Sequence, residues 1–184
     1  MKHLESKNMS TPQAKLNKPN QDEYAPYYEK YVSLLPAGDV VATLRKQLDD
    51  TLTLLGGIEE SQAGKRYAPD KWSIKELIGH LIDTERVFAY RAMTFARNDT
   101  TPLPGFDQDP YVSNGNFDSR TLADLAEEFE HLRRSNAHFF QALSEEAWNR
   151  RGTANDSEVS VRALAHIIAG HEAHHVQILK TRYL

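Results

Sequence analysis

Hydrophobic residues recur at helical spacing in four long stretches of this chain. The first stretch follows Asp39 and carries apolar residues at intervals of four, four, four and three, namely Val40, Leu44, Leu48, Leu52 and Leu55. This spacing is typical of an amphipathic helix, and the glycine pair at Gly56 and Gly57 predicts where the helix ends.

Three further stretches show the same period. The second begins at Ser73, which forms the pattern of a capping box with Glu76, and it extends to about residue 98. The third covers about 120–142, and the fourth begins after the capping residue Ser160 and extends to about residue 182. No segment of useful length alternates with the period of a strand. Four helices of about 18 to 26 residues predict an all-α fold, a four-helix bundle.

The segments between these helices are expected to differ in character. Residues 1–23 are polar and without periodicity, which predicts a disordered N-terminal arm, whereas 24–36 are rich in tyrosine and should pack on the domain without a long helix. The connection over 99–118 is unusually long for a compact domain, and such loops are more often functional. Residues 144–159 form a polar connection with a helical turn at SEEAW. The chain is therefore divided into an arm, 1–23, and one domain, 24–184.

Composition narrows the classes of function. The net charge is −4, with 22 basic and 26 acidic residues and no basic cluster, so we expect no nucleic-acid partner. The absence of cysteine excludes disulfides, thiolate ligands and a thiol nucleophile from the protein. No apolar run reaches the roughly 18 residues of a membrane span, and the first residues lack the apolar core of a signal peptide. We therefore expect a cytoplasmic protein with no membrane partner.

Three histidines lie on the apolar faces of two predicted helices. His171 and His175 are four residues apart on the last helix, so both project from one face. His80 lies on the apolar face of the second helix, which it shares with Thr84 and Arg91. Imidazoles are costly to bury without a partner, and three of them leave a coordination position open on a catalytic metal ion. The pattern predicts a three-histidine metal site.

The same helical geometry places other polar residues at the edge of the apolar faces or away from them. Glu172 should lie toward the edge of the core face as a solvated carboxylate, and Glu85 should lie on the side of its helix opposite His80. His174 falls at the edge of the apolar stripe, and His166 points largely away from the core.

Axial heights of the histidines bear on topology. His80 lies on the order of 10 Å from the start of its helix, and the late pair lies about 13 Å from the end of its own. These heights match best if the second and fourth helices are antiparallel, which favours an up-down-down-up order with a long loop between helices 2 and 3. That loop would return Phe106, Asp107, Asp109 and Tyr111 toward the metal end.

The string HEAHH also fits the H-E-x-x-H pattern of zinc proteases, with Glu172 as general base. The third ligand of such a site is missing, because Thr181 stands at one expected position and no Glu follows Glu172. An HExxH zinc protease is therefore a less favoured alternative.

Three segments together resemble the DinB-like (YfiT-like) metal-binding four-helix bundle family: KWSIKELIGHLIDTERVFAYR, PLPGFDQD and SVRALAHIIAGHEAHHVQIL. The resemblance covers about 72–184 and implies that His80, His171 and His175 are the ligands of a divalent metal, nickel or zinc. It also implies an up-down-down-up bundle and a homodimer. Some relatives are transferases or isomerases that use a low-molecular-weight thiol such as bacillithiol or mycothiol.

The leading hypothesis is a metal-dependent transferase or hydrolase that acts on a small molecule. The metal would lower the pKa of a bound water or of a cosubstrate thiol, since the chain has no thiol of its own. Asp107 and Asp109 are the candidate catalytic residues, as partners of a ligand histidine or as a base. Arg91 and Thr84 are candidate substrate contacts. Two alternatives stay open: a non-enzymatic protein that binds a metal or small ligand, and a purely structural bundle.

Overall fold

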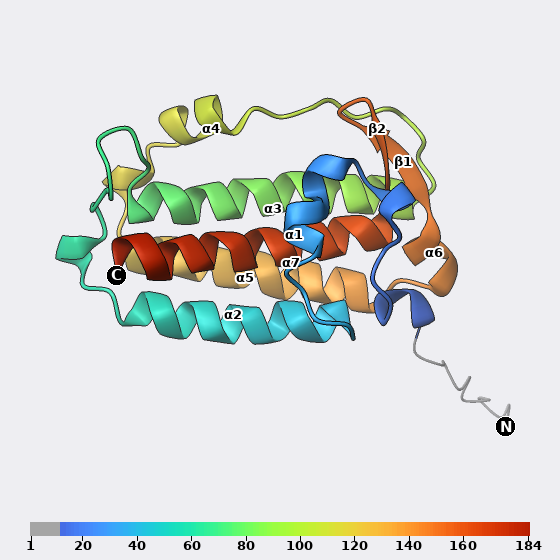
Figure 1. Cartoon of the computed structure of the whole chain (residues 1–184), viewed down its shortest axis with the longest axis horizontal. Helices are drawn as coiled ribbons and strands as arrows, with labels where there is room; N and C mark the ends of the chain where they lie inside the picture. Colours follow the sequence, from blue (N-terminus) through green and yellow to red (C-terminus); the bar gives the residue numbers. More distant parts are fainter. Residues whose placement is uncertain (1–11) are drawn as a thin grey trace, which may run out of the picture.

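The computed structural model describes residues 12–184, and four long helices form its body (Figure 1). These are α2 (Val40–Gly56), α3 (Ile74–Ala96), α5 (Leu122–Gln141) and α7 (Val161–Ile178). Each begins after a residue whose side chain accepts a backbone N–H of the first turn, namely Asp39, Ser73, Thr121 and Ser160. Such caps satisfy donors that the helix leaves free. The four predicted helices are confirmed, as is the capping box of Ser73 and Glu76.

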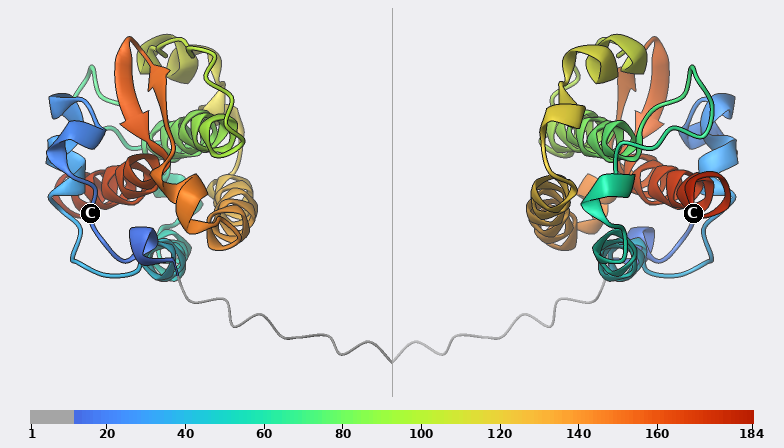
Figure 2. Two further views of the ribbon diagram at one scale, coloured as in Figure 1. Left: turned by 90° about the vertical axis from the view of Figure 1, so that its right-hand side faces the viewer. Right: turned by 90° about the vertical axis from the view of Figure 1, so that its left-hand side faces the viewer.

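The four helices pack as a bundle, which Figure 2 shows end-on. α3 contacts α5 and α7, and α2 contacts the same two helices from the other side. The apolar core forms two clusters. One joins the first turns of α2 and α7 to the last turns of α3 and α5, and the other joins the opposite ends. The colour gradient in Figure 1 agrees: α2 and α7 run one way along the bundle, and α3 and α5 run the other way.

Shorter helices cover the bundle. The tyrosine-rich segment packs on the domain without a long helix, as predicted, and the structure shows that it contacts α7. The helical turn at SEEAW is confirmed. The connection between α3 and α5, expected to lack structure, contains a helix and a 3-10 turn. These shorter elements are η3 (Pro26–Tyr28), α1 (Glu29–Val32), η4 (Glu60–Gln62), α4 (Gln108–Asn114), η5 (Phe117–Ser119), α6 (Glu145–Asn149) and the terminal π-helix η6 (Leu179–Tyr183).

A β-hairpin corrects the expectation of a purely helical fold. β1 (Arg151–Ala154) pairs antiparallel with β2 (Ser157–Ser160). The two residues between them, Asn155 and Asp156, have φ angles of 51° and 57°. Asn and Asp tolerate this left-handed conformation, which tight two-residue hairpins require. The strands are too short for alternation to reveal them, so the Asn-Asp pair was the available signal.

The N-terminal assignment also needs correction. Residues 12–23 form η1 (Gln13–Lys15) and η2 (Gln21–Glu23) and pack on the domain rather than forming a disordered arm. Lys15 pairs with Asp39 at 3.0 Å, and the Glu23 carboxylate accepts a hydrogen bond of 2.7 Å from the Ser160 hydroxyl. The residues of each pair are distant in sequence, so the local pattern of hydrophobic residues could not predict these contacts. Residues 1–11 of the predicted arm lie outside the described residues.

Among the helices of residues 12–184, none combines the length and the apolar composition that crossing a membrane requires.

Candidate metal centre

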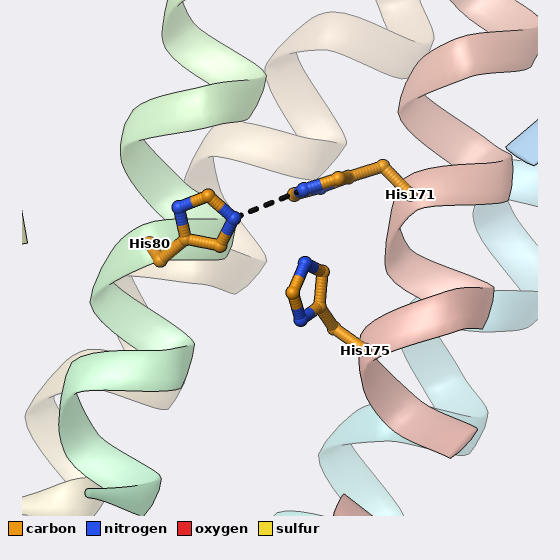
Figure 3. Close-up of side chains that lie close together, drawn as sticks. All are labelled: His80, His171 and His175. Carbon is orange, nitrogen blue, oxygen red and sulfur yellow. Dashed lines mark hydrogen bonds between the residues drawn. The ribbon is translucent and has the colours of Figure 1, made fainter. Parts of the chain in front are cut away.

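His80 of α3 and His171 and His175 of α7 converge between the two helices (Figure 3). One ring nitrogen of each histidine lies within 4.8 Å of those of the other two, and the Nε2 atoms of His80 and His171 are 3.0 Å apart. The three side chains are 2%, 5% and 9% exposed. Their convergence follows from the i, i+4 spacing on α7 and from the antiparallel packing of α3.

Burial keeps these imidazoles neutral. Desolvation lowers the pKa of His80 to about 4 and that of His175 to about 3, and it holds the pKa of His171 well below its usual value. Each ring therefore offers a lone pair at neutral pH. The Nδ1 atom of His175 is buried and has no hydrogen-bond partner among residues 12–184. A donor set of three neutral imidazoles fits a divalent transition metal such as zinc or nickel.

Neighbouring side chains hold the histidine rings in place. The hydroxyl oxygen of Thr84, one turn after His80, lies 3.3 Å from His80 Nδ1, which leaves Nε2 directed at the other histidines. The ring of Trp72 lies 4.6 Å from that of His80, and the ring of Tyr31 lies 5.2 Å from that of His171, centroid to centroid. Hydrogen bonds to the second ring nitrogen fix the tautomer of ligand histidines in metalloproteins.

A buried ionic cluster lies beside the histidines. The positions of its residues on their helices did not predict it. Arg133 of α5 donates to Glu85 at 2.7 Å and to Glu172 at 2.5 Å, and all three side chains are nearly inaccessible. The expectation that Glu172 is a solvated edge residue was wrong, because Arg133 supplies its counter-charge inside the bundle. Glu85 is likewise buried. A charged residue on the apolar stripe of α5, between Phe129 and Ala137, was the available signal.

The Glu172 carboxylate is therefore already engaged. Besides Arg133, it accepts a hydrogen bond of 2.7 Å from the Thr51 hydroxyl. The general base required by the zinc-protease alternative is thus held within the ionic cluster.

The structure also corrects the position of His166, which was expected to point largely away from the core. The ring is buried, and its Nδ1 lies 2.9 Å from the carbonyl oxygen of Arg162. Burial lowers the pKa of His166 to about 4. Glu23 of the N-terminal segment binds Ser160 and Arg162 at the start of the same helix, and helical phase does not predict such a contact between distant segments.

Two cavities reach the histidines from different sides. The first, of about 100 Å³, adjoins His80 and His171 and contains both predicted substrate contacts, Thr84 and Arg91. Its other walls come from five aromatic residues and two amides: Tyr27, Tyr28, Tyr31, Phe88, Phe106, Gln108 and Asn155. Asn155 stands at the tip of the hairpin, so the unpredicted strands contribute directly to this cavity.

The second cavity, of about 310 Å³, adjoins His175 and shares Gln108 with the first. Asp109 lines it, together with Trp72 and Lys71. Asp107 does not line either cavity. It caps α4 by accepting the backbone N–H of Asp109 at 3.1 Å, and both carboxylates are exposed.

The sequence model of the DinB superfamily matches residues 43–179, a stretch that contains all three histidines, and the chain therefore belongs to this superfamily. The fold is similar to that of YfiT from Bacillus subtilis, described as a probable metal-dependent hydrolase with an unusual four-helix bundle topology. The TM-score is 0.67 at 13% identity, over 89% of both chains. It is also similar to the mycothiol-dependent maleylpyruvate isomerase, with a TM-score of 0.64 at 15% identity over 79% of this chain. The similarity spans 61% of that isomerase. No curated protein sequence matches this chain significantly.

Proposed function

We propose that this protein is a divalent-metal-dependent enzyme that catalyses a transfer or a hydrolysis on a small molecule, with His80, His171 and His175 as the metal ligands. The observation that carries the proposal is the convergence of three buried, neutral imidazoles beside two cavities. The description of YfiT as a probable metal-dependent hydrolase supports it.

Nickel and zinc are the proposed metals, because imidazole ligands suit both. A bound ion would supply Lewis acidity, which lowers the pKa of a water or thiol that it contacts. The residues around it have separate roles. Thr84 orients His80, while Trp72 and Tyr31 cover the rings and exclude water.

A low-molecular-weight thiol is the proposed cosubstrate if the reaction is a transfer. The chain has no cysteine, so a thiol nucleophile must be bound from outside. The description of one structural relative as mycothiol-dependent supports this choice. The two cavities offer separate places for two molecules, and Asp109 in the larger one is the proposed proton acceptor. Asp107 acts through the start of α4, which it caps.

A non-enzymatic role in binding a metal or small ligand is the second candidate. One observation favours it: none of the residues that line the smaller cavity in the described chain is a carboxylate, so a general base is missing there. We also propose that the protein forms a homodimer, which light scattering would test.

Metal content tests the site. The protein should retain about one equivalent of nickel or zinc when it is expressed in metal-supplemented medium and purified without chelator, as measured by mass spectrometry of the metal. The His171→Ala/His175→Ala variant should fall below about 0.1 equivalent. A matched control is His131→Ala/His138→Ala, which removes two exposed histidines of α5 and should retain the metal. Equal metal content in both variants would refute the site.

Turnover then separates enzyme from binding protein. Metal-loaded protein should show activity in panels of thiol-transfer and hydrolysis substrates that the His171→Ala/His175→Ala variant lacks. Full metal occupancy without turnover on any panel would favour the binding role.

A further inference from the structure

Arg91 is a buried cation without an anionic partner. Its side chain is 4% exposed and lines the smaller cavity together with His80 and His171. One nitrogen, Nη2, donates a hydrogen bond of 2.7 Å to the carbonyl oxygen of Pro104. No carboxylate among residues 12–184 lies within ion-pair distance of the guanidinium.

The other buried charges of the described chain are all paired. Lys15 lies 3.0 Å from Asp39, and Arg133 pairs with both Glu85 and Glu172. The remaining buried carboxylate, Glu23, pairs with a partly buried arginine of α7. Burying a charge without a counter-charge costs free energy, so proteins rarely do so without a reason. Arg91 is the exception among the buried charges of the described chain. This indicates that its counter-charge is supplied by a bound anionic ligand.

The cavity beside Arg91 is also lined by two of the candidate metal ligands, His80 and His171. Arg91 follows His80 by 11 residues, three turns of α3 or about 16 Å of helix rise. Side chains of a helix lean toward its N-terminus, so the long Arg91 side chain is directed back toward His80. The guanidinium also lies over the ring of Phe88, 5.5 Å from its centroid.

Aromatic side chains form much of the remaining wall of this cavity. The rings of Tyr28 and Phe88 meet edge to face at 5.9 Å. The Tyr28 phenol lies close enough to Arg91 to oppose the lowering of the arginine pKa, which burial causes. Tyr28 does not replace a carboxylate, because a phenol is neutral at physiological pH and burial raises the pKa of Tyr28 further.

We propose that the ligand of this cavity is a small organic carboxylate with a flat apolar body, whose carboxylate pairs with Arg91 and whose other end reaches His80 and His171. A guanidinium binds a planar carboxylate through two parallel hydrogen bonds, which gives geometric selectivity for this group. The aromatic walls suit a flat apolar body. This inference rests on the proposed function for the place of the reaction, but the recognition of charge comes from Arg91 and not from the metal.

Two ligands of similar shape, one charged and one neutral, test whether this cavity recognises the negative charge of a carboxylate. Phenylacetate and its neutral isostere phenylacetamide are titrated into the full chain, in metal-loaded and metal-free form, with binding followed by calorimetry or NMR. Wild-type protein should bind phenylacetate at least tenfold more tightly than the amide, in both forms. Arg91→Met should lose this preference while it retains about one equivalent of metal. The control Arg97→Met removes the exposed arginine at the C-terminal cap of α3 and should keep the preference.

Thermal unfolding gives a second, ligand-free measurement. Arg91→Met removes an unpaired buried charge and keeps an apolar side chain against Phe88, so it should raise the Tm of the metal-free protein, whereas Arg97→Met should not. Phenylacetate should raise the Tm of wild-type protein more than that of Arg91→Met.

Three results would overturn the proposal: equal binding of acid and amide by wild-type protein, an undiminished preference in Arg91→Met, or a preference that vanishes when the metal is removed. The last result would assign the carboxylate to the metal. Loss of metal binding alone, with the Arg91-dependent preference intact, would instead refute the proposed metal site and leave this inference standing.

Discussion

Arg133 Nη1 and Glu172 Oε2 lie 2.5 Å apart in the interior of the bundle, and neither side chain is more than 2% exposed. The same guanidinium binds Glu85, so α3, α5 and α7 are joined through one side chain. Glu172 directly follows His171 in sequence. The ionic cluster therefore fixes the rotation of α7 that directs His171 toward His80.

Replacement of Arg133 should be severely destabilising. Arg133→Met leaves two carboxylates buried without a counter-charge, and breaking a buried pair in this way costs about 3–5 kcal/mol. Urea unfolding at pH 7 should show this loss in the free energy of unfolding. Arg134→Met is the matched control, because it removes an exposed arginine whose pair with Glu130 contributes under about 1 kcal/mol. Similar losses in the two variants would contradict the role given to the cluster.

The hydroxyl of Thr84 should matter for metal affinity more than for stability. Thr84→Val keeps the shape of the side chain but removes the partner of His80 Nδ1. Loss of such a contact typically weakens metal binding about 10- to 100-fold, which competition with a chelator would measure. Thr94→Val is the control on the same helix, since that hydroxyl binds only the carbonyl of Tyr90. If both variants bind metal alike, Thr84 does not orient the ligand.

Stability of the metal-free protein should fall as the pH is lowered. The buried histidines have pKa values of about 4 for His80 and His166 and about 3 for His175, whereas the unfolded chain takes up these protons near pH 6.5. Below pH 6.5 the unfolded state binds more protons than the folded state, so stability is greatest above that pH and decreases as the pH falls to about 3.

His166 allows this effect to be measured away from the metal site. A shift from 6.5 to about 4 corresponds to about 3 kcal/mol at most. His166→Gln should therefore make the decrease in unfolding free energy between pH 6.5 and pH 4 less steep, as followed by urea unfolding across this range. His131→Gln, at an exposed position of α5, should leave the slope unchanged. An unchanged slope in the His166 variant would show that its burial does not govern the titration.

Gly170 marks the closest approach of α1 to α7. A Cβ atom at this position would lie 2.2 Å from the carbonyl oxygen of Tyr31, a backbone atom that only a movement of α1 could displace. Gly170→Ala should therefore lower the stability by about 1–3 kcal/mol, seen as a lower Tm. Gly56→Ala is the control, because a Cβ there meets nothing within 4 Å and alanine favours a helix. A Tm of Gly170→Ala at or above that of wild-type protein would contradict this packing.

Local features of the chain follow from the order of its residues. Helical periodicity and side-chain caps act over three or four residues, so the four long helices and the start of α3 at Ser73 were predicted correctly. The i, i+4 relation of His171 and His175 is equally local. Placing His80 opposite them needed only the phase of the apolar face and the heights along two helices, and the cluster of the three nitrogens agrees.

The surroundings of these histidines depend on contacts between elements that are far apart in the sequence. Arg133 is separated by 48 residues from Glu85 and by 39 from Glu172, and no local pattern indicates which carboxylates a buried arginine will meet. The packing of residues 12–23 and the position of Asn155 in the cavity likewise depend on contacts between distant segments. The helices and the three imidazoles on their apolar faces could be predicted from the order of residues, because both depend on spacing within an element. The ion pairs, the cavities and the lack of a counter-charge at Arg91 could be found only in the folded structure. The reason is that residues of other helices and loops determine which side chains are buried and which charges are paired.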